Sequence, residues 1–205
     1  MTALPTTPAT TPSELTAERS SRPWGRIACA AAAVGTFAPF AMSSFSGDDG
    51  TEITASLVDS SMLLMSGAYV AVLVAAGLFL AAVRLGRAAG GDAGRVVTMA
   101  GSAVALMYAA YYGSFGAGGV VGAEMVGDPG PGLGEATAVL VNVTEIARFA
   151  PGLALVVAVL TVRSLPRWVR VTAGVLAVMT LVPFTSWVAA LLIPVWLGAA
   201  AALRH

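Results

Sequence analysis

Glu145 and Arg148 are the residues of this chain whose types and position could do chemistry. They lie near the middle of an apolar stretch that runs from Ala136 to Val162. Because residues three apart are neighbours on a helix, the pair shares one face with Asn142. A charge at the centre of a bilayer costs roughly 2.5–3.5 kcal/mol on insertion scales. Two opposite charges there predict an ion pair that is turned toward other helices.

The pair has two interpretations. As a structural pair, assisted by Asn142 and Thr144, it would fix the packing and register of the helices. As a proton- or anion-responsive site it would titrate at Glu145, because arginine is effectively always charged. Tyr108 lies on an earlier apolar segment and could donate to Glu145 if the two segments are adjacent. We predict a buried polar cluster of Glu145, Arg148, Asn142 and Tyr108, and we favour the structural role.

The composition is that of a membrane protein. Of the 205 residues, 57% are hydrophobic and only 11% are charged, whereas ordinary globular domains carry about 25% charged residues. Arginine supplies every basic side chain, since the sequence contains no lysine. This usage, with abundant alanine, glycine and valine, is typical of a high-GC bacterial gene. The expected fold class is an all-α, polytopic transmembrane helical bundle in the inner (plasma) membrane.

Several classes of chemistry are excluded by missing residue types. Cys29 is the only cysteine, so an intrachain disulfide and a cysteine-pair metal or redox site are ruled out. The only histidine is His205, which leaves no base to activate Ser114 in its Gly-Ser-Phe-Gly context. The glycine-rich run 116–122 has no preceding strand and lacks the spacing of a dinucleotide loop. We therefore expect no enzyme activity, no catalytic residues, no cofactor and no metal.

Acidic residues between the apolar runs could in principle bind a divalent cation. The run 48–52 offers oxygen ligands but not the spacing of a calcium loop, so a solvated acidic surface is the preferred interpretation. The residues are Asp48, Asp49, Glu52, Asp59, Glu124, Asp128 and Glu135.

Six apolar segments predict six membrane spans in a domain covering 23–205. The last apolar run, 171–203, would be about 50 Å long as one helix, but a bilayer core is about 30 Å thick. We expect this run to fold back at 183–186, the alternative being one tilted, kinked span with an interfacial segment. The expected spans are 24–45, 61–83, 96–115, 136–162, 168–182 and 187–203.

The remaining segments are expected to be irregular. Residues 1–22 are rich in threonine and proline and predict a disordered cytoplasmic tail. One of the polar residues 59–61 is expected to cap the second span. The Gly- and Pro-rich segment 116–135 predicts a flexible loop. Tyr111 and Tyr112 fit an interfacial aromatic belt.

The arginines predict the orientation. Cytoplasmic loops carry an excess of basic residues, and here alternate loops carry arginine while the others carry only acids. Both termini are therefore expected in the cytoplasm. The arginines outside the spans are Arg19, Arg22, Arg26, Arg84, Arg87, Arg95, Arg163, Arg167, Arg170 and Arg204.

The C-terminal segment carries a family resemblance. The matching residues are Ser164, Leu165, Pro166, Arg167 and Trp168, followed by Pro194, Trp196 and Arg204. In these positions the chain resembles a C-terminal hairpin common in six-span integral membrane proteins of bacteria. The resemblance covers about a fifth of the chain and implies a topology; no activity is assigned to those families.

Two functions are compatible with these features. The leading hypothesis is a small non-enzymatic membrane module or subunit. Its partners would be the lipid bilayer and a second copy or another membrane protein, with no nucleic acid. The small-residue stripe Gly67, Ala71 and Ala75 favours such close helix association. The alternative is a small transporter or channel-like protein that uses Glu145 and Arg148 as a proton- or anion-responsive site.

Overall fold

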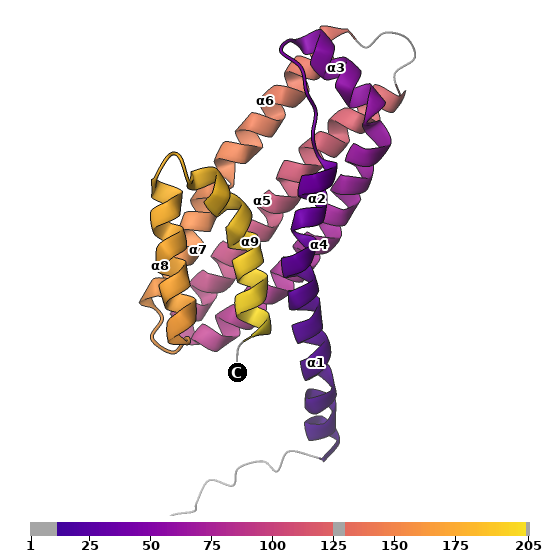
Figure 1. The fold of residues 1–205 in the computed structure, drawn as a ribbon. Helices are drawn as coiled ribbons and strands as arrows, with labels where there is room; N and C mark the ends of the chain where they lie inside the picture. Colours follow the sequence, from indigo (N-terminus) through magenta and orange to yellow (C-terminus); the bar gives the residue numbers. More distant parts are fainter. Residues whose placement is uncertain (1–11, 125–129, 204–205) are drawn as a thin grey trace, which may run out of the picture.

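The computed structural model describes residues 12–124 and 130–203, and every regular element in this part is a helix (Figure 1). The prediction of an all-helical bundle is confirmed at this level. In chain order the helices are α1 (Pro12–Gly35), α2 (Phe37–Met42), α3 (Gly50–Asp59), α4 (Ser61–Ala89), α5 (Gly91–Glu124), α6 (Pro131–Ala147), α7 (Phe149–Thr161), α8 (Arg167–Leu181) and α9 (Ser186–Ala202).

Four helical stretches in the described part are long and apolar enough to cross a membrane. The α4–α5 hairpin is the longest unit, and with 34 residues α5 is about 51 Å long. That length exceeds a bilayer core of about 30 Å. The four stretches are Pro23–Met42, Ser61–Ala89, Gly91–Glu124 and Pro131–Thr161.

The last apolar run folds back as expected. Helix α8 ends at Leu181 and α9 begins at Ser186, so the turn falls where the sequence predicts it. The indole Nε1 of Trp196 donates to the hydroxyl of Thr172 at 2.8 Å and ties the two helices together. With 15 and 17 residues, these helices are about 22 and 26 Å long, shorter than the four stretches above.

The structure corrects the expected polar loop before α4. Residues Gly50–Asp59 form helix α3, which has an N-terminal cap at Asp49. The Asp49 carboxylate accepts from the amides of Thr51 and Glu52, and the Glu52 carboxylate accepts from the amide of Asp48. The predicted side-chain cap of α4 is wrong, because the Ser60 side chain makes no such bond.

The expected flexible loop 116–135 is mostly helical. Helix α5 continues to Glu124 and α6 begins at Pro131, and residues 125–129 lie outside the described part. Glycine is accommodated in this part of α5 because it allows α4 to pack closely. A methyl group on Gly116 would overlap the side chain of Ala68. In membranes, small residues commonly mark such helix contacts.

The structure also differs from the expected disordered tail. Helix α1 begins at Pro12, so the backbone of 12–22 is helical, while residues 1–11 lie outside the described part. Glu14, Leu15 and Ala17 are good helix formers, and the adjoining span supplies a template on which the helix continues.

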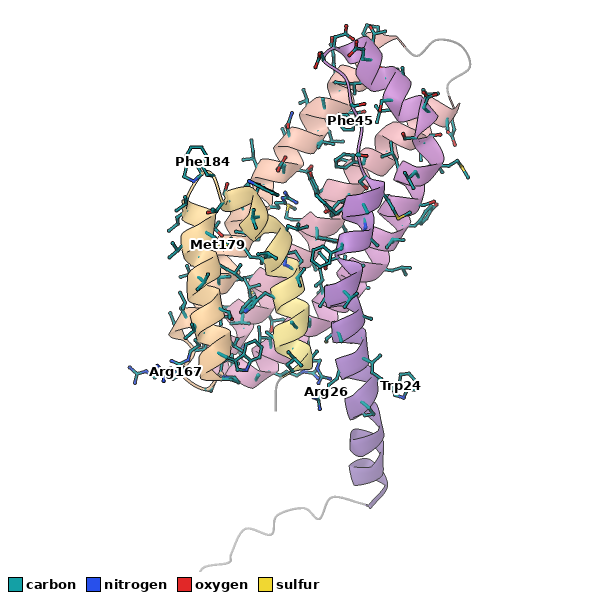
Figure 2. The ribbon with its side chains drawn as sticks, in the orientation of Figure 1. Trp24, Arg26, Phe45, Arg167, Met179 and Phe184 are labelled. Carbon is teal, nitrogen blue, oxygen red and sulfur yellow. The ribbon has the colours of Figure 1, made fainter. Side chains whose placement is uncertain are left out.

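The two ends of the bundle differ in charge. Figure 2 places Trp24, Arg26 and Arg167 at one end, where the α4–α5 turn also lies. The Arg26 Nε donates to the carbonyl of Ala202 at 2.9 Å, which brings the start of the first span to the end of α9. At the opposite end, α3 and its acidic cap pack against the start of α6. We call these the arginine end and the acidic end.

Candidate functional site

Arg148 occupies the junction between α6 and α7. Ala147 ends α6 and Phe149 begins α7, and Arg148 itself has helical dihedral angles. Pro151 has no amide hydrogen, so the carbonyl of Ala147 loses the partner that a regular helix would supply. Prolines are a common cause of such breaks in helices. The sequence therefore places the guanidinium at a local interruption of a long apolar helix.

The structure brings the two predicted charged side chains together. Arg148 Nη2 donates to Glu145 Oε1 at 3.2 Å. The Arg148 side chain is 13% exposed and that of Glu145 is 34% exposed. Arg148 is therefore the buried member of the pair, while Glu145 reaches the surface of the bundle.

Tyr111 of α5 supplies a second contact to the guanidinium. The Arg148 Cζ lies 4.2 Å from the centroid of the Tyr111 ring, a cation–π geometry worth about 0.5–2 kcal/mol. The ring is held by edge-on contacts to Tyr112 and Phe115, with centroids 4.9 and 5.4 Å away. Arg148 thus joins α5 to the α6–α7 junction.

A small cavity of about 20 Å³ also borders Arg148. Tyr108 of α5 and Ala190 and Pro194 of α9 line it together with Arg148. Pro194 leaves the carbonyl of Ala190 without an amide partner from its own helix. Arg148 Nε is buried and has no hydrogen-bond partner among the described residues. The cavity has room for about one water molecule.

The other residues predicted near the ion pair make their hydrogen bonds elsewhere or lie on the surface. Tyr108 is buried, but its hydroxyl donates to the carbonyl of Thr36 at 2.9 Å instead of to Glu145. Asn142 is exposed on the surface of the bundle. The Thr144 hydroxyl donates to carbonyls of its own helix, at Leu140 and Val141. Tyr108 therefore borders Arg148 only across the cavity, and no hydrogen bond joins Tyr108, Asn142 or Thr144 to the ion pair.

Tyr111 is a site residue that the sequence did not predict. The sequence predicts an interfacial belt of Tyr111 and Tyr112, whereas in the structure Tyr112 is only 2% exposed and Tyr111 faces Arg148. A signal was present in the spacing: Tyr108, Tyr111, Tyr112 and Phe115 share one helix face. Such an aromatic face inside a span offers the π surface that a buried arginine requires.

Some carboxylates of the acidic end accept hydrogen bonds from backbone amides. Asp49 and Glu52 cap α3, as described above. Within residues 12–124 and 130–203, no group of three or more histidine, cysteine, aspartate or glutamate residues is arranged to hold a metal ion. Asp128 lies outside the described residues.

Comparison with known proteins adds no relative. No family model, no curated protein and no solved structure matches the chain.

Proposed function

We propose that this chain is a non-enzymatic, multi-pass module of the inner membrane, in which Arg148 holds the packing of the bundle. The observation that carries the proposal is the environment of the guanidinium. It contacts Glu145 on α6 and Tyr111 on α5, and it borders α9 across a cavity of about 20 Å³. A side chain that joins several helices beside a cavity the size of one water molecule fits a structural role.

The core beyond the ion pair supports the same role. Between Arg148 and the arginine end, the bundle interior is filled by buried aliphatic side chains of α4, α5 and α7. A pathway for ions requires polar side chains or water along its length. The buried residues that instead occupy this region include Leu78, Ala82, Leu85, Val97, Val104, Leu155, Val156 and Val159.

The membrane orientation proposed here has both termini in the cytoplasm. The arginine end would face the cytoplasm, following the bias of basic loops. Four long spans return the chain to that end at Arg163, and the α8–α9 hairpin returns it there again. The C-terminal side is therefore the same whether the hairpin crosses the membrane, giving six spans, or enters and leaves on one side.

A reporter fusion tests this orientation. Green fluorescent protein at the C-terminus is expected to fluoresce, and alkaline phosphatase at the same position is expected to be inactive, because both report a cytoplasmic end. An active phosphatase fusion would contradict the proposed orientation.

Labelling at the turn between α8 and α9 distinguishes six spans from a re-entrant hairpin. Phe184 is 89% exposed at this turn (Figure 2). In a Cys29→Ala background, Phe184→Cys is expected to react with a membrane-impermeant maleimide added outside intact spheroplasts. A cysteine at Arg167, also exposed, should react only after the membrane is opened. If the cysteine at 184 is unreactive from outside but labels after detergent treatment, the six-span arrangement is wrong.

A transporter function is the second candidate, and the exposure of Glu145 favours it. At 34% exposure the Glu145 carboxylate is the more accessible member of the pair. In this case Glu145→Gln would abolish proton or anion flux into proteoliposomes under an imposed membrane potential, with expression and folding intact. Under the structural proposal, wild-type and Glu145→Gln proteoliposomes give the same flux as empty vesicles.

A further inference from the structure

A concave surface lies between α4 and α5 at the arginine end. Its volume is about 550 Å³, and Arg87 and Arg95 stand on its two sides. Its floor is main chain, because Gly86 and Gly94 approach so closely that a methyl group on either would overlap the carbonyl of the other. We call this surface the α4–α5 cleft.

The glycines of the turn keep the cleft open. Gly90 and Gly91 have φ values of +72° and +54°, a region that residues with a side chain rarely adopt. A Cβ built on either would meet no atom within 4 Å. No side chain from the turn therefore fills the space between the two arginines.

Few acidic side chains of the described part lie near the two arginines to neutralise their charge. Arg87 is exposed and forms no ion pair with any described residue. Arg95 contacts Asp92 at 3.3 Å, but both side chains are more than 80% exposed, and exposed ion pairs contribute little to stability. Among the described residues from 23 onward, this end carries one acidic residue, Asp92, against seven arginines. These are Arg26, Arg84, Arg87, Arg95, Arg163, Arg167 and Arg170.

The wall of the cleft on the side of the bilayer is apolar. Met99, which lines the cleft, is 73% exposed, and the neighbouring Val96 is 52% exposed. Positive groups at the rim and an apolar wall about one helical turn away match the two chemical parts of a phospholipid. Basic pockets between transmembrane helices on the cytoplasmic side are suited to anionic head groups.

We propose that the α4–α5 cleft binds an anionic diacyl phospholipid of the cytoplasmic leaflet. Arg87 and Arg95 hold its phosphate, and an acyl chain lies along Met99 and Val96. The inference rests on the orientation proposed above, since it requires the arginine end to lie at the cytoplasmic surface. Each arginine near a membrane surface contributes about a fivefold gain in affinity for anionic lipid.

Lipid titration of the full-length protein in detergent, followed by native mass spectrometry, tests the cleft. Phosphatidylglycerol and phosphatidylcholine with the same acyl chains are compared for wild type, Arg87→Gln/Arg95→Gln and Arg163→Gln/Arg167→Gln. The second double variant removes the same charge from arginines that do not line the cleft, and Figure 2 shows Arg167 at the same end. We expect wild type to prefer phosphatidylglycerol by at least about tenfold. The cleft variant should lose about fivefold in affinity per arginine, and the control variant should stay within about twofold of wild type.

Three results would overturn the proposal. Equal losses in both double variants would mean diffuse attraction to the whole arginine end. Equal binding of the two lipids would mean no anion preference, and saturable binding of inorganic phosphate with the same affinity would identify a site for a soluble anion. The single variants Arg87→Gln and Arg95→Gln keep the test decisive if the double variant fails to fold. A C-terminal reporter on the same proteins separates the causes: if it still reads cytoplasmic, only the lipid site is wrong.

Discussion

Arg148→Ala is expected to destabilise the purified protein in detergent by about 1–3 kcal/mol. The loss combines the cation–π contact to Tyr111, worth about 0.5–2 kcal/mol, with the polar contact to Glu145. Polar contacts between membrane helices average about 0.6 kcal/mol. Unfolding by a denaturing detergent, followed by circular dichroism, gives the difference. Arg167→Ala is the matched control, because Arg167 is exposed and forms no ion pair with a described residue.

The double variant Glu145→Gln/Arg148→Gln distinguishes the loss of the ion pair from the cost of leaving one charge without a partner. Removing only the arginine leaves the partly buried Glu145 carboxylate without its partner, a costly state for a charge in an apolar setting. The double variant should therefore be more stable than Arg148→Ala while remaining below wild type. If the single and double changes all leave the unfolding free energy unchanged, the pair is incidental and the structural role of Arg148 is wrong.

Gly116→Leu is expected to disrupt the α4–α5 hairpin. A Cβ at Gly116 would overlap the side chain of Ala68, and the Leu64 carbonyl lies 3.5 Å away. The two helices must separate or shift to admit a larger side chain, and overpacking of this kind costs about 1–3 kcal/mol. The expected result is lower yield and a lower midpoint in thermal unfolding monitored by fluorescence-detected size exclusion.

Gly113→Leu controls for helix propensity in the same experiment. Gly113 belongs to the same helix, three residues away, and a Cβ there would meet no atom within 4 Å. Leucine is a better helix former than glycine by up to about 1 kcal/mol, so this variant should be at least as stable as wild type. Equal destabilisation by both changes would show that the Gly116–Ala68 contact does not determine the packing of the hairpin.

Hydrophobic pattern was enough to predict the long helices but not the segments between them. The spans at 61–83 and 96–115 lie inside α4 and α5, and the fold-back near residue 183 follows from length alone. Helix α3 was missed because its polar, acidic residues resemble a loop, although Asp49 and Glu52 form a recognisable cap. The end of α5 was missed because glycine is a poor helix former in isolation, and only packing against α4 and α6 explains it.

The candidate site divides in the same way. The contact between Glu145 and Arg148 is local, three residues apart on one helix, and sequence spacing predicts it. The partners from other helices depend on rotations that no spacing rule supplies. Tyr108 donates to Thr36 on the segment that joins α1 and α2, and Tyr111 takes the place beside Arg148. A sequence can indicate which helices are adjacent. It does not indicate whether Tyr108 or Tyr111 faces the arginine.

The shortness of α8 and α9 has a consequence for the surrounding lipid. If both helices cross the bilayer, their lengths of about 22 and 26 Å fall below a core of about 30 Å. Lipid on that side of the bundle must thin, at a cost of a fraction of a kcal/mol per Å of mismatch, while lipid beside the longer α4–α5 hairpin need not. The protein would then deform the membrane on one side only. Two membrane proteins that thin the bilayer on one side lower the total cost when their thinned sides meet. This bundle would therefore have a preferred direction for assembly without any specific contact.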